Sequence, residues 1–162
     1  KLESGKIDFD LKPQDVLKLV NEAIETNSHY GQKYQVRYLL NQNSESALVN
    51  VDTNRFMQIM GNLLSNAAKF SPENSTVNIR VTKKNRTVRV TVEDKGSGIK
   101  EESRTLIFDK FYQSDSTDSR HSGGTGLGLA ISKELVERMG GEINFTTTVG
   151  LGTSFYFDLP EV

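Results

Sequence analysis

Residues 123–131 read GGTGLGLAI, which places four glycines directly before an apolar helical pattern. Glycine is the least favourable helix residue apart from proline, at roughly 1 kcal/mol worse than alanine. A residue without a Cβ lets the backbone approach a ligand closely, and the free N–H groups at a helix start attract anions. The stretch therefore favours a polyphosphate lying across a helix N-terminus. A flexible hinge before a helix is the alternative interpretation.

Two familiar phosphate-binding motifs do not fit these glycines. A P-loop requires G-x-x-x-x-G-K-[ST], and no lysine follows the glycines here. The dinucleotide-binding fingerprint requires G-x-G-x-x-G, whereas the spacing here is G-x-G-x-G. A second start for that fingerprint, at Gly96, has Glu101 in the place of the third glycine. Both motifs are therefore excluded.

The composition narrows the class of protein. The 162 residues suit one domain, and 20 basic residues against 21 acidic ones give a formal net charge of −1. That balance offers no reason to expect nucleic acid or an anionic membrane as a partner. No apolar run approaches the roughly 18 residues that a membrane span needs. The chain has no cysteine, which excludes disulfides and thiolate metal sites.

Hydrophobic periodicity predicts helices and strands in mixed order. Apolar residues that alternate along the chain predict strands, at residues 7–11, 34–40, 48–51, 77–81, 88–92, 143–145 and 155–159. Apolar residues three and four apart predict helices, over residues 13–31, 53–70 and 127–139. Hairpins connect the later strands, so we predict an α+β fold: a two-layer α/β sandwich in which a mixed, mainly antiparallel sheet is covered on one face by about three helices.

The segment NLLSNAAKF, residues 62–70, places polar side chains on one face of a predicted helix. Asn62, Asn66 and Lys69 are four and three residues apart, so they project from the same face. An amide oxygen suits Mg²⁺, which keeps most of its waters, and a lysine one turn further can reach a phosphate oxygen. A solvated polar face is the alternative. Asparagine is a poor residue for a helix interior, however, which favours a functional interpretation.

The segment EDKGSGI, residues 93–99, follows a predicted strand. The alternation places Glu93 outside and Asp94 inside, where a carboxylate needs a hydrogen-bond donor. The exocyclic amine of adenine would be such a donor, and Gly96 and Gly98 would let the chain turn tightly around the ring. A β-turn with a solvated aspartate is the alternative, because D-x-G is common in turns.

These motifs occur in an order that closely resembles the catalytic, ATP-binding domain of the sensor histidine kinases of two-component systems, which has the Bergerat (GHKL ATPase) fold. NLLSNAAKF matches the N box of that family, and DKGSGI matches its first glycine box. IFDKFYQ matches the F box, GGTGLGLAI the second glycine box and GLGTSF the third. The first residues, KLESGKIDFD, resemble the junction that follows the dimerisation helices of the family.

The resemblance implies a role for each matched residue. Asn66 would hold Mg²⁺, with Asn62 nearby, and Lys69 would contact phosphate, so these three are the expected catalytic residues. Together with them, the residues expected to bind the nucleotide are Phe70, Asp94, Gly96, Gly98, Ile99, Phe111, Gly124, Thr125, Gly126, Leu127, Gly128 and Thr153. Among these, Asp94 would bind the adenine amine, with Thr153 near it. Many relatives carry tyrosine in place of Phe70.

The resemblance also implies a domain organisation. We expect residues 1–10 to be the remnant of the junction after the dimerisation and phosphoacceptor helices, and residues 11–162 to be the catalytic domain. Residues 112–123 would form a flexible ATP lid, with Phe108 and Phe111 at its base. The domain would be cytoplasmic, and its parent protein can be anchored in the inner membrane.

The same resemblance favours a histidine protein kinase over an ATPase. Related ATPases carry a glutamate one turn before the Mg²⁺ asparagine, whereas Asn62 occupies that place, and its amide cannot accept a proton at neutral pH. His29 lacks the acidic neighbour and the amphipathic helix of a phosphoacceptor, and His121 falls in the predicted lid. The phosphorylated histidine is therefore expected outside this chain.

The expected partners follow from this interpretation. The γ-phosphate of Mg²⁺–ATP would pass to a histidine on a separate helical dimerisation domain of the same protein, and then to an aspartate in the receiver domain of a response regulator. The isolated domain would be a monomer and the parent protein a homodimer, with no nucleic acid as partner. A degenerate nucleotide-binding regulatory module and a slow ATPase of the same fold are the alternative functions.

Overall fold

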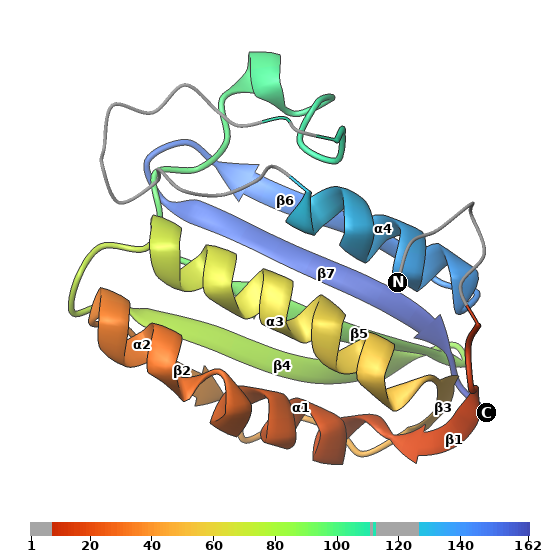
Figure 1. The fold of residues 1–162 in the computed structure, drawn as a ribbon. Helices are drawn as coiled ribbons and strands as arrows, with labels where there is room; N and C mark the ends of the chain where they lie inside the picture. The colour runs from red at the N-terminus through yellow and green to blue at the C-terminus, as the bar shows by residue number, and fades with distance from the viewer. Residues whose placement is uncertain (1–7, 111, 113–126) are drawn as a thin grey trace.

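Residues 8–110, 112 and 127–162 are described by the computed structural model, and they form two layers. One layer is a five-stranded sheet with the order β2-β4-β5-β7-β6, and α-helices form the other (Figure 1). The strands of the sheet are β2 (Arg37–Leu40), β4 (Thr76–Lys84), β5 (Thr87–Glu93), β6 (Glu142–Thr148) and β7 (Gly152–Pro160). The α+β sandwich predicted from the sequence is confirmed.

The sheet is mixed, as expected. In the described part of the chain, β2 runs parallel to β4, and the other neighbouring strands are antiparallel. The β4–β5 and β6–β7 hairpins occur where alternation predicted them. A separate antiparallel pair is formed by β1 (Lys12–Asp15) and β3 (Leu48–Val51).

The strand predicted at residues 7–11 is wrong. Residues 8–11 are outside any strand, and the pairing with β3 begins at Lys12 and includes Pro13, which was expected to open a helix. A strand at a sheet edge tolerates proline, because the missing N–H is not needed for pairing. The helix begins only at Val16, since the side chain of Asp15 accepts a hydrogen bond from Leu17 N at 3.0 Å.

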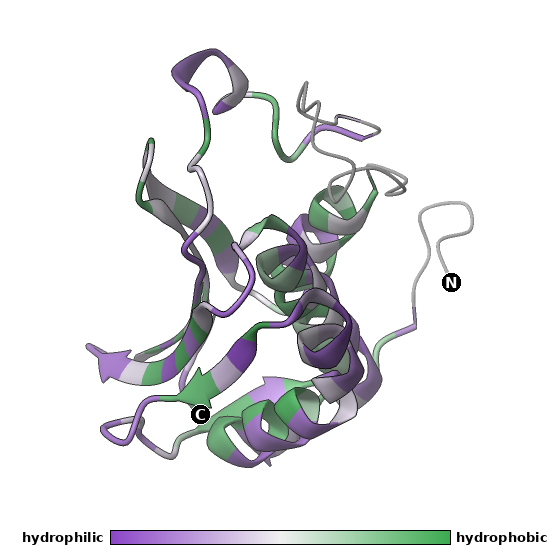
Figure 2. Ribbon diagram, turned by 90° about the vertical axis from the view of Figure 1, so that its left-hand side faces the viewer, coloured by the Kyte–Doolittle hydropathy of each residue, from purple (hydrophilic) through white to green (hydrophobic). Residues whose placement is uncertain are grey.

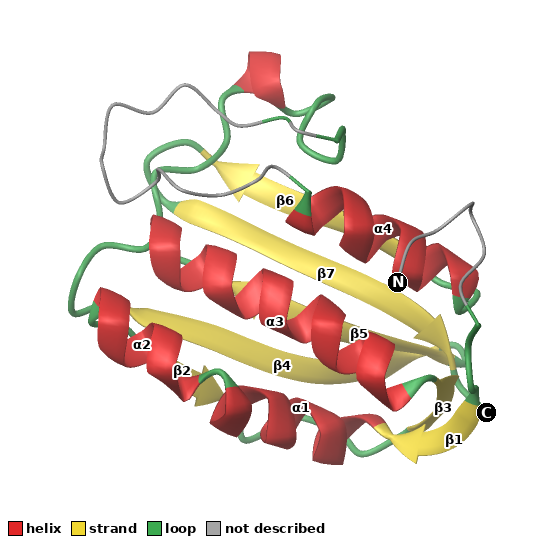
Figure 3. Cartoon of the chain, viewed as in Figure 1, coloured by secondary structure: helices red, strands yellow, loops and turns green. Residues whose placement is uncertain are grey.

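Four α-helices of the described residues cover one face of the sheet (Figures 2 and 3). They are α1 (Val16–Thr26), α2 (Ser28–Tyr34), α3 (Thr53–Phe70) and α4 (Gly128–Arg138). The helix predicted over residues 13–31 is divided into α1 and α2 at Asn27, whose buried Nδ2 donates to Ala23 O at 2.8 Å. The same carbonyl also accepts the backbone N–H of Asn27, at 3.0 Å. Within the described ranges, no helix has the length and apolar character to cross a membrane.

The core lies between the two layers. Alternate side chains of the strands are fully or almost fully buried on the helix side, at Val77, Ile79, Val81, Val88, Val90, Val92, Phe157 and Leu159. From the helix layer, Phe56 of α3 meets the ring of Phe157 edge-on, with centroids 5.7 Å apart and an interplanar angle of 71°. The opposite face of the sheet is polar, and there Arg89 pairs with Asp158 through two hydrogen bonds.

Replacing Phe157 by alanine is expected to lower the free energy of unfolding by about 3–5 kcal/mol, because a fully buried aromatic ring is lost and a cavity remains. Urea unfolding followed by circular dichroism measures this change. Leu151→Ala is the control, since Leu151 is 71% exposed and its loss should change stability by no more than about 0.5 kcal/mol. Equal effects of the two substitutions would contradict the placement of Phe157 in the core.

Candidate functional site

A hydrogen-bonded link joins α3 to the start of α4. The side-chain Nδ2 of Asn62 donates to Gly128 O and to Ser132 Oγ, each at 3.1 Å. Ser132 is fully buried, and the two helices run side by side (Figure 1). Both N–H donors of the Asn62 amide are therefore engaged, and its Oδ1 is the atom left to accept a further hydrogen bond. The contact places the N-terminus of α4 against the middle of α3.

Asn66 and Lys69 lie one and two turns further along α3, towards its end. Both side chains are half-buried. Among the described residues, none forms a hydrogen bond or an ion pair with either side chain. Within the described ranges, the amide of Asn66 and the ammonium of Lys69 thus have no partner, and they lie near the end of α3, beyond the point where α4 begins.

Asp94 follows β5 and is only 6% exposed, which confirms the inward orientation predicted from alternation. Its Oδ1 accepts hydrogen bonds from Gly96 N at 2.8 Å and from Thr153 N at 3.2 Å. Burial raises the pKa of the Asp94 carboxyl above its ordinary value, although the two backbone N–H groups act in the opposite direction. The position thus combines an acidic group with surroundings that disfavour its charge.

The turn after β5 packs so tightly that two of its positions require glycine. A Cβ on Gly96 would lie 2.6 Å from Phe70 O, at the end of α3. Gly98 has φ +83°, and a Cβ there would lie 2.6 Å from Thr148 O, in the β6–β7 hairpin. The turn is therefore held between the end of α3 and that hairpin, which fixes Asp94 relative to both.

Two threonines on neighbouring strands extend this network. Thr147 of β6 pairs in register with Thr153 of β7, and their hydroxyl oxygens are 2.9 Å apart. Ile99 N donates to Thr147 Oγ1 at 2.9 Å. Thr153 was predicted as a site residue, whereas Thr147 was missed. Alternation in β6 places Thr147 on the same side as the buried Ile143, but its contact with Thr153 follows from the register of β6 with β7.

The remaining predicted residues divide into those that the structure places and those outside it. Phe70 ends α3 and is 37% exposed, Ile99 is half-buried, and Leu127 is the N-cap residue of α4. Phe108 packs against the ring of Phe155 edge-on, at a centroid distance of 6.3 Å. The residues that lie outside the described ranges are Phe111, Gly124, Thr125, Gly126 and, apart from Tyr112, the predicted lid.

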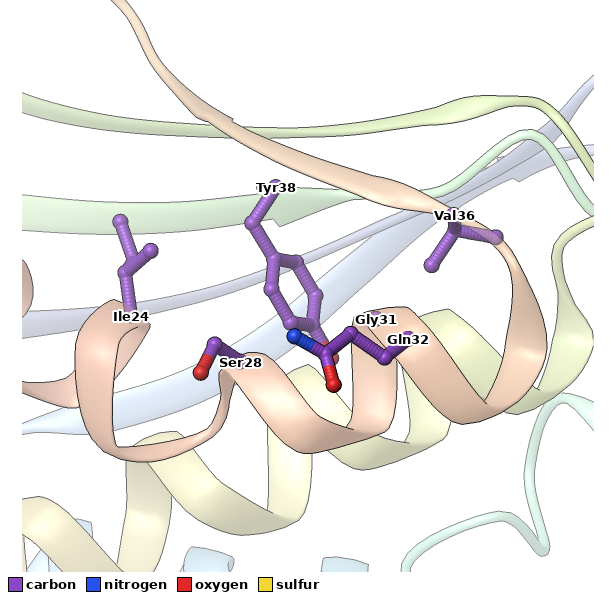
Figure 4. A pocket seen from close by; sticks show the side chains of 6 residues that line it. All are labelled: Ile24, Ser28, Gly31, Gln32, Val36 and Tyr38. Atoms are coloured by element: carbon purple, nitrogen blue, oxygen red, sulfur yellow. The ribbon is translucent and has the colours of Figure 1, made fainter.

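A pocket of about 260 Å³ lies elsewhere, between α1, α2 and β2 (Figure 4). It is lined by Ile24, Ser28, Gly31, Gln32, Val36 and Tyr38. The Tyr38 hydroxyl reaches past the pocket and donates to Leu64 O of α3 at 2.6 Å. None of the lining residues belongs to the predicted site, so this pocket is separate from the constellation around Asp94.

Comparison with known proteins shows the family of the chain. A family described as "Histidine kinase-, DNA gyrase B-, and HSP90-like ATPase" matches residues 51–162. The sensor histidine kinase WalK of Bacillus subtilis is 37% identical over 99% of this chain, which covers 26% of WalK. The first curated relatives are matched over only 18% to 26% of their own length.

Two solved structures share the fold. The catalytic domain of histidine kinase ThkA has a TM-score of 0.79 and 28% identity, with 96% of this chain and 97% of that chain covered. Full-length ShkA in complex with AMPPNP has a TM-score of 0.83 and 30% identity, with 96% of this chain and 32% of that chain covered. The chain therefore belongs to the HATPase_c family, and it is the ATP-binding catalytic domain of a sensor histidine kinase.

Proposed function

We propose that the domain binds ATP with Mg²⁺ between the end of α3, the turn after β5 and the start of α4, and transfers the γ-phosphate to a histidine on a separate helical domain. The observation that carries this proposal is the Asn62 link from α3 to Gly128 and Ser132 of α4. It brings the N-terminus of α4, an anion-binding element, beside the helix that carries Asn66 and Lys69. ShkA, whose structure is similar over 96% of this chain, was solved in complex with AMPPNP, and this supports a nucleotide as the ligand.

The base of the nucleotide would lie at Asp94. An ionised carboxylate only accepts hydrogen bonds, so it suits the exocyclic amine of adenine. Oδ1 of Asp94 is already held by Gly96 N and Thr153 N, which leaves Oδ2 for that amine. The exposed ring of Phe70 would contact the adenine, and Ile99 would line its other side.

The phosphates would lie at the other end, where the backbone N–H groups at the start of α4 and the ammonium of Lys69 provide positive charge. In the described ranges no three His, Cys, Asp or Glu side chains gather into a metal site. The available ligand is the neutral amide of Asn66, which fits Mg²⁺, because this ion keeps several waters and takes further oxygens from phosphates. When bound, the ion would neutralise charge on the phosphates during transfer.

Asn62 favours phosphotransfer over hydrolysis. An amide cannot take a proton from water, and both its N–H donors are held by α4. We infer that the nucleophile is a histidine of another domain, because a neutral imidazole is nucleophilic without a base. In the reaction, the bond between the γ-phosphorus and the bridging oxygen breaks, a nitrogen–phosphorus bond forms, and ADP leaves. His29 is exposed on α2, outside the residues proposed to bind ATP.

The partners are inferred from the relatives. We infer that the histidine belongs to a dimerisation domain of the same protein, and that the phosphoryl group then passes to the receiver domain of a response regulator. We also infer that the domain is cytoplasmic, that it is a monomer when isolated, and that the parent protein is a homodimer.

Asn66→Ala is expected to abolish the gain in ATP affinity that Mg²⁺ provides. The loss should reach at least the roughly tenfold change that follows mutation of even an outer-shell metal partner. Calorimetric titration of ATP with and without Mg²⁺ measures it. Asn54→Ala, an exposed asparagine in the first turn of the same helix, is the matched control and should retain the Mg²⁺ effect. An unchanged Mg²⁺ effect in Asn66→Ala would disprove the metal assignment.

Asp94→Asn is expected to weaken ATP binding without lowering stability. The loss of a charge-assisted hydrogen bond corresponds to roughly 10- to 100-fold in affinity. The oxygen of the new side-chain amide would still accept from Gly96 N and Thr153 N. Burial raises the pKa of Asp94 in the folded state above its value in the unfolded state. Between these two pKa values the folded chain binds more protons than the unfolded chain, so the free energy of unfolding falls as pH rises through this range. The neutral amide of Asn does not ionise, so this loss of stability with rising pH is removed.

Urea unfolding between pH 4 and pH 7, with ATP titration at pH 7, tests the expectation. Asp10→Asn changes the formal charge equally at an exposed position and should alter neither property. Retained ATP affinity in Asp94→Asn would contradict the proposed adenine contact, and strong destabilisation would contradict the account of the buried charge.

A further inference from the structure

Three polar contacts meet at one hydroxyl oxygen, Oγ1 of Thr147. Ile99 N donates to it at 2.9 Å. Gly152 O lies 3.1 Å from it, and Oγ1 of Thr153 lies 2.9 Å from it. A threonine hydroxyl has one hydrogen to donate and two lone pairs that accept, so these three contacts use its whole capacity.

Only one arrangement of hydrogens satisfies all three contacts. A backbone N–H can only donate and a carbonyl can only accept, so Thr147 accepts from Ile99 N and gives its single hydrogen to Gly152 O. The contact between the two hydroxyls is then a hydrogen bond only if Thr153 donates and Thr147 accepts. The direction of the Thr153 hydroxyl is therefore set by Thr147.

This direction determines what the neighbourhood of Asp94 offers to a ligand. With its hydrogen directed to Thr147, the Thr153 hydroxyl has only lone pairs left for other partners. The backbone of Thr153 is bonded to Asp94 twice, through Thr153 N to Oδ1 at 3.2 Å and through Asp94 N to Thr153 O at 2.8 Å. Thr153 and Asp94 are 5% and 6% exposed. The Thr153 hydroxyl and the Asp94 carboxylate thus belong to two residues that are joined through the backbone and are both nearly closed to solvent.

We propose that Thr147 is a positioning residue for base selection. It accepts the hydrogen of the Thr153 hydroxyl, so that this hydroxyl cannot donate to the base. The nucleotide site then favours a purine with an amine at position 6 over a purine with a carbonyl oxygen there. Such an oxygen would face acceptors only and would be left without a partner, which a closed site rejects. The inference rests on the proposed placement of the base at Asp94. It adds Thr147 as the residue that makes the Thr153 hydroxyl an acceptor and not a donor towards the base.

The unmodified chain gives the first test. Calorimetric titration with ATP, inosine triphosphate and GTP separates the group at position 6 from the additional amine of guanine. Inosine triphosphate is expected to bind roughly 10- to 100-fold more weakly than ATP, because the charge-assisted hydrogen bond from the amine to Asp94 is lost. Equal affinity for these two nucleotides would overturn the inference while leaving ATP binding intact. Failure to bind ATP at all would instead overturn the proposed function.

Substitution of Thr147 gives the second test. Thr147→Val keeps the shape of the side chain but removes the acceptor, so the Thr153 hydroxyl becomes free to donate to a carbonyl oxygen. The ratio of ATP affinity to inosine triphosphate affinity is expected to fall by about tenfold. Thr147→Ser retains the hydroxyl and should preserve the ratio. Thr146→Val, at the neighbouring exposed position of β6, should also preserve it.

A purely structural role for Thr147 predicts a different result. In that case Thr147→Val would weaken both nucleotides by the same factor and leave the ratio unchanged, which would overturn the inference. Thermal unfolding of each variant shows whether it is folded. The comparison of nucleotides on the unmodified chain does not depend on the folding of any variant.

Discussion

The Asn62 amide is the contact on which the arrangement of the site depends. Its two N–H groups donate to Gly128 O and Ser132 Oγ, so α4 begins beside Asn62, in the middle of α3. The helices cover one face of the sheet and share its apolar core, but apolar packing is non-directional and does not by itself fix where one helix starts against another. A directional pair of hydrogen bonds does, and it makes the positions of Asn66 and of the α4 N-terminus depend on each other.

The opposite end of the site is organised by the backbone. Asp94 is held by Gly96 N and Thr153 N, and the turn that carries it fits against Phe70 O because Gly96 has no Cβ. Backbone contacts of this kind form a rigid support at the proposed base end of the site. The proposed phosphate end differs, because it consists of side chains on α3 and N–H groups of α4. The proposed site thus joins a rigid support for the base to a junction between two helices.

Sequence reasoning succeeded where one periodic pattern determined the outcome. The β4–β5 hairpin, the extent of α3 and the inward orientation of Asp94 all follow from alternation or from spacing of three and four. It failed at Asn27, where the first predicted helix is divided into α1 and α2, because the periodic pattern continues across the break. It missed Thr147 because the contact between the Thr147 and Thr153 hydroxyls depends on the register of β6 with β7. Asn62 was predicted to lie on the same helix face as Asn66 and Lys69, and its bonds to α4 could be found only from the tertiary structure.

The buried carboxylate of Asp94 connects stability with function. Burial disfavours its charge, and the raised pKa shows that the two backbone N–H groups compensate only in part. A residue chosen for stability alone would be a neutral group of the same shape, because it could accept the same two bonds without the desolvation penalty. The raised pKa of this nearly closed acid fits the proposed hydrogen bond from a ligand amine. The proposed role of Thr147 agrees with this interpretation. If the Thr153 hydroxyl donates its hydrogen to Thr147, the ligand has to supply the donor for Asp94.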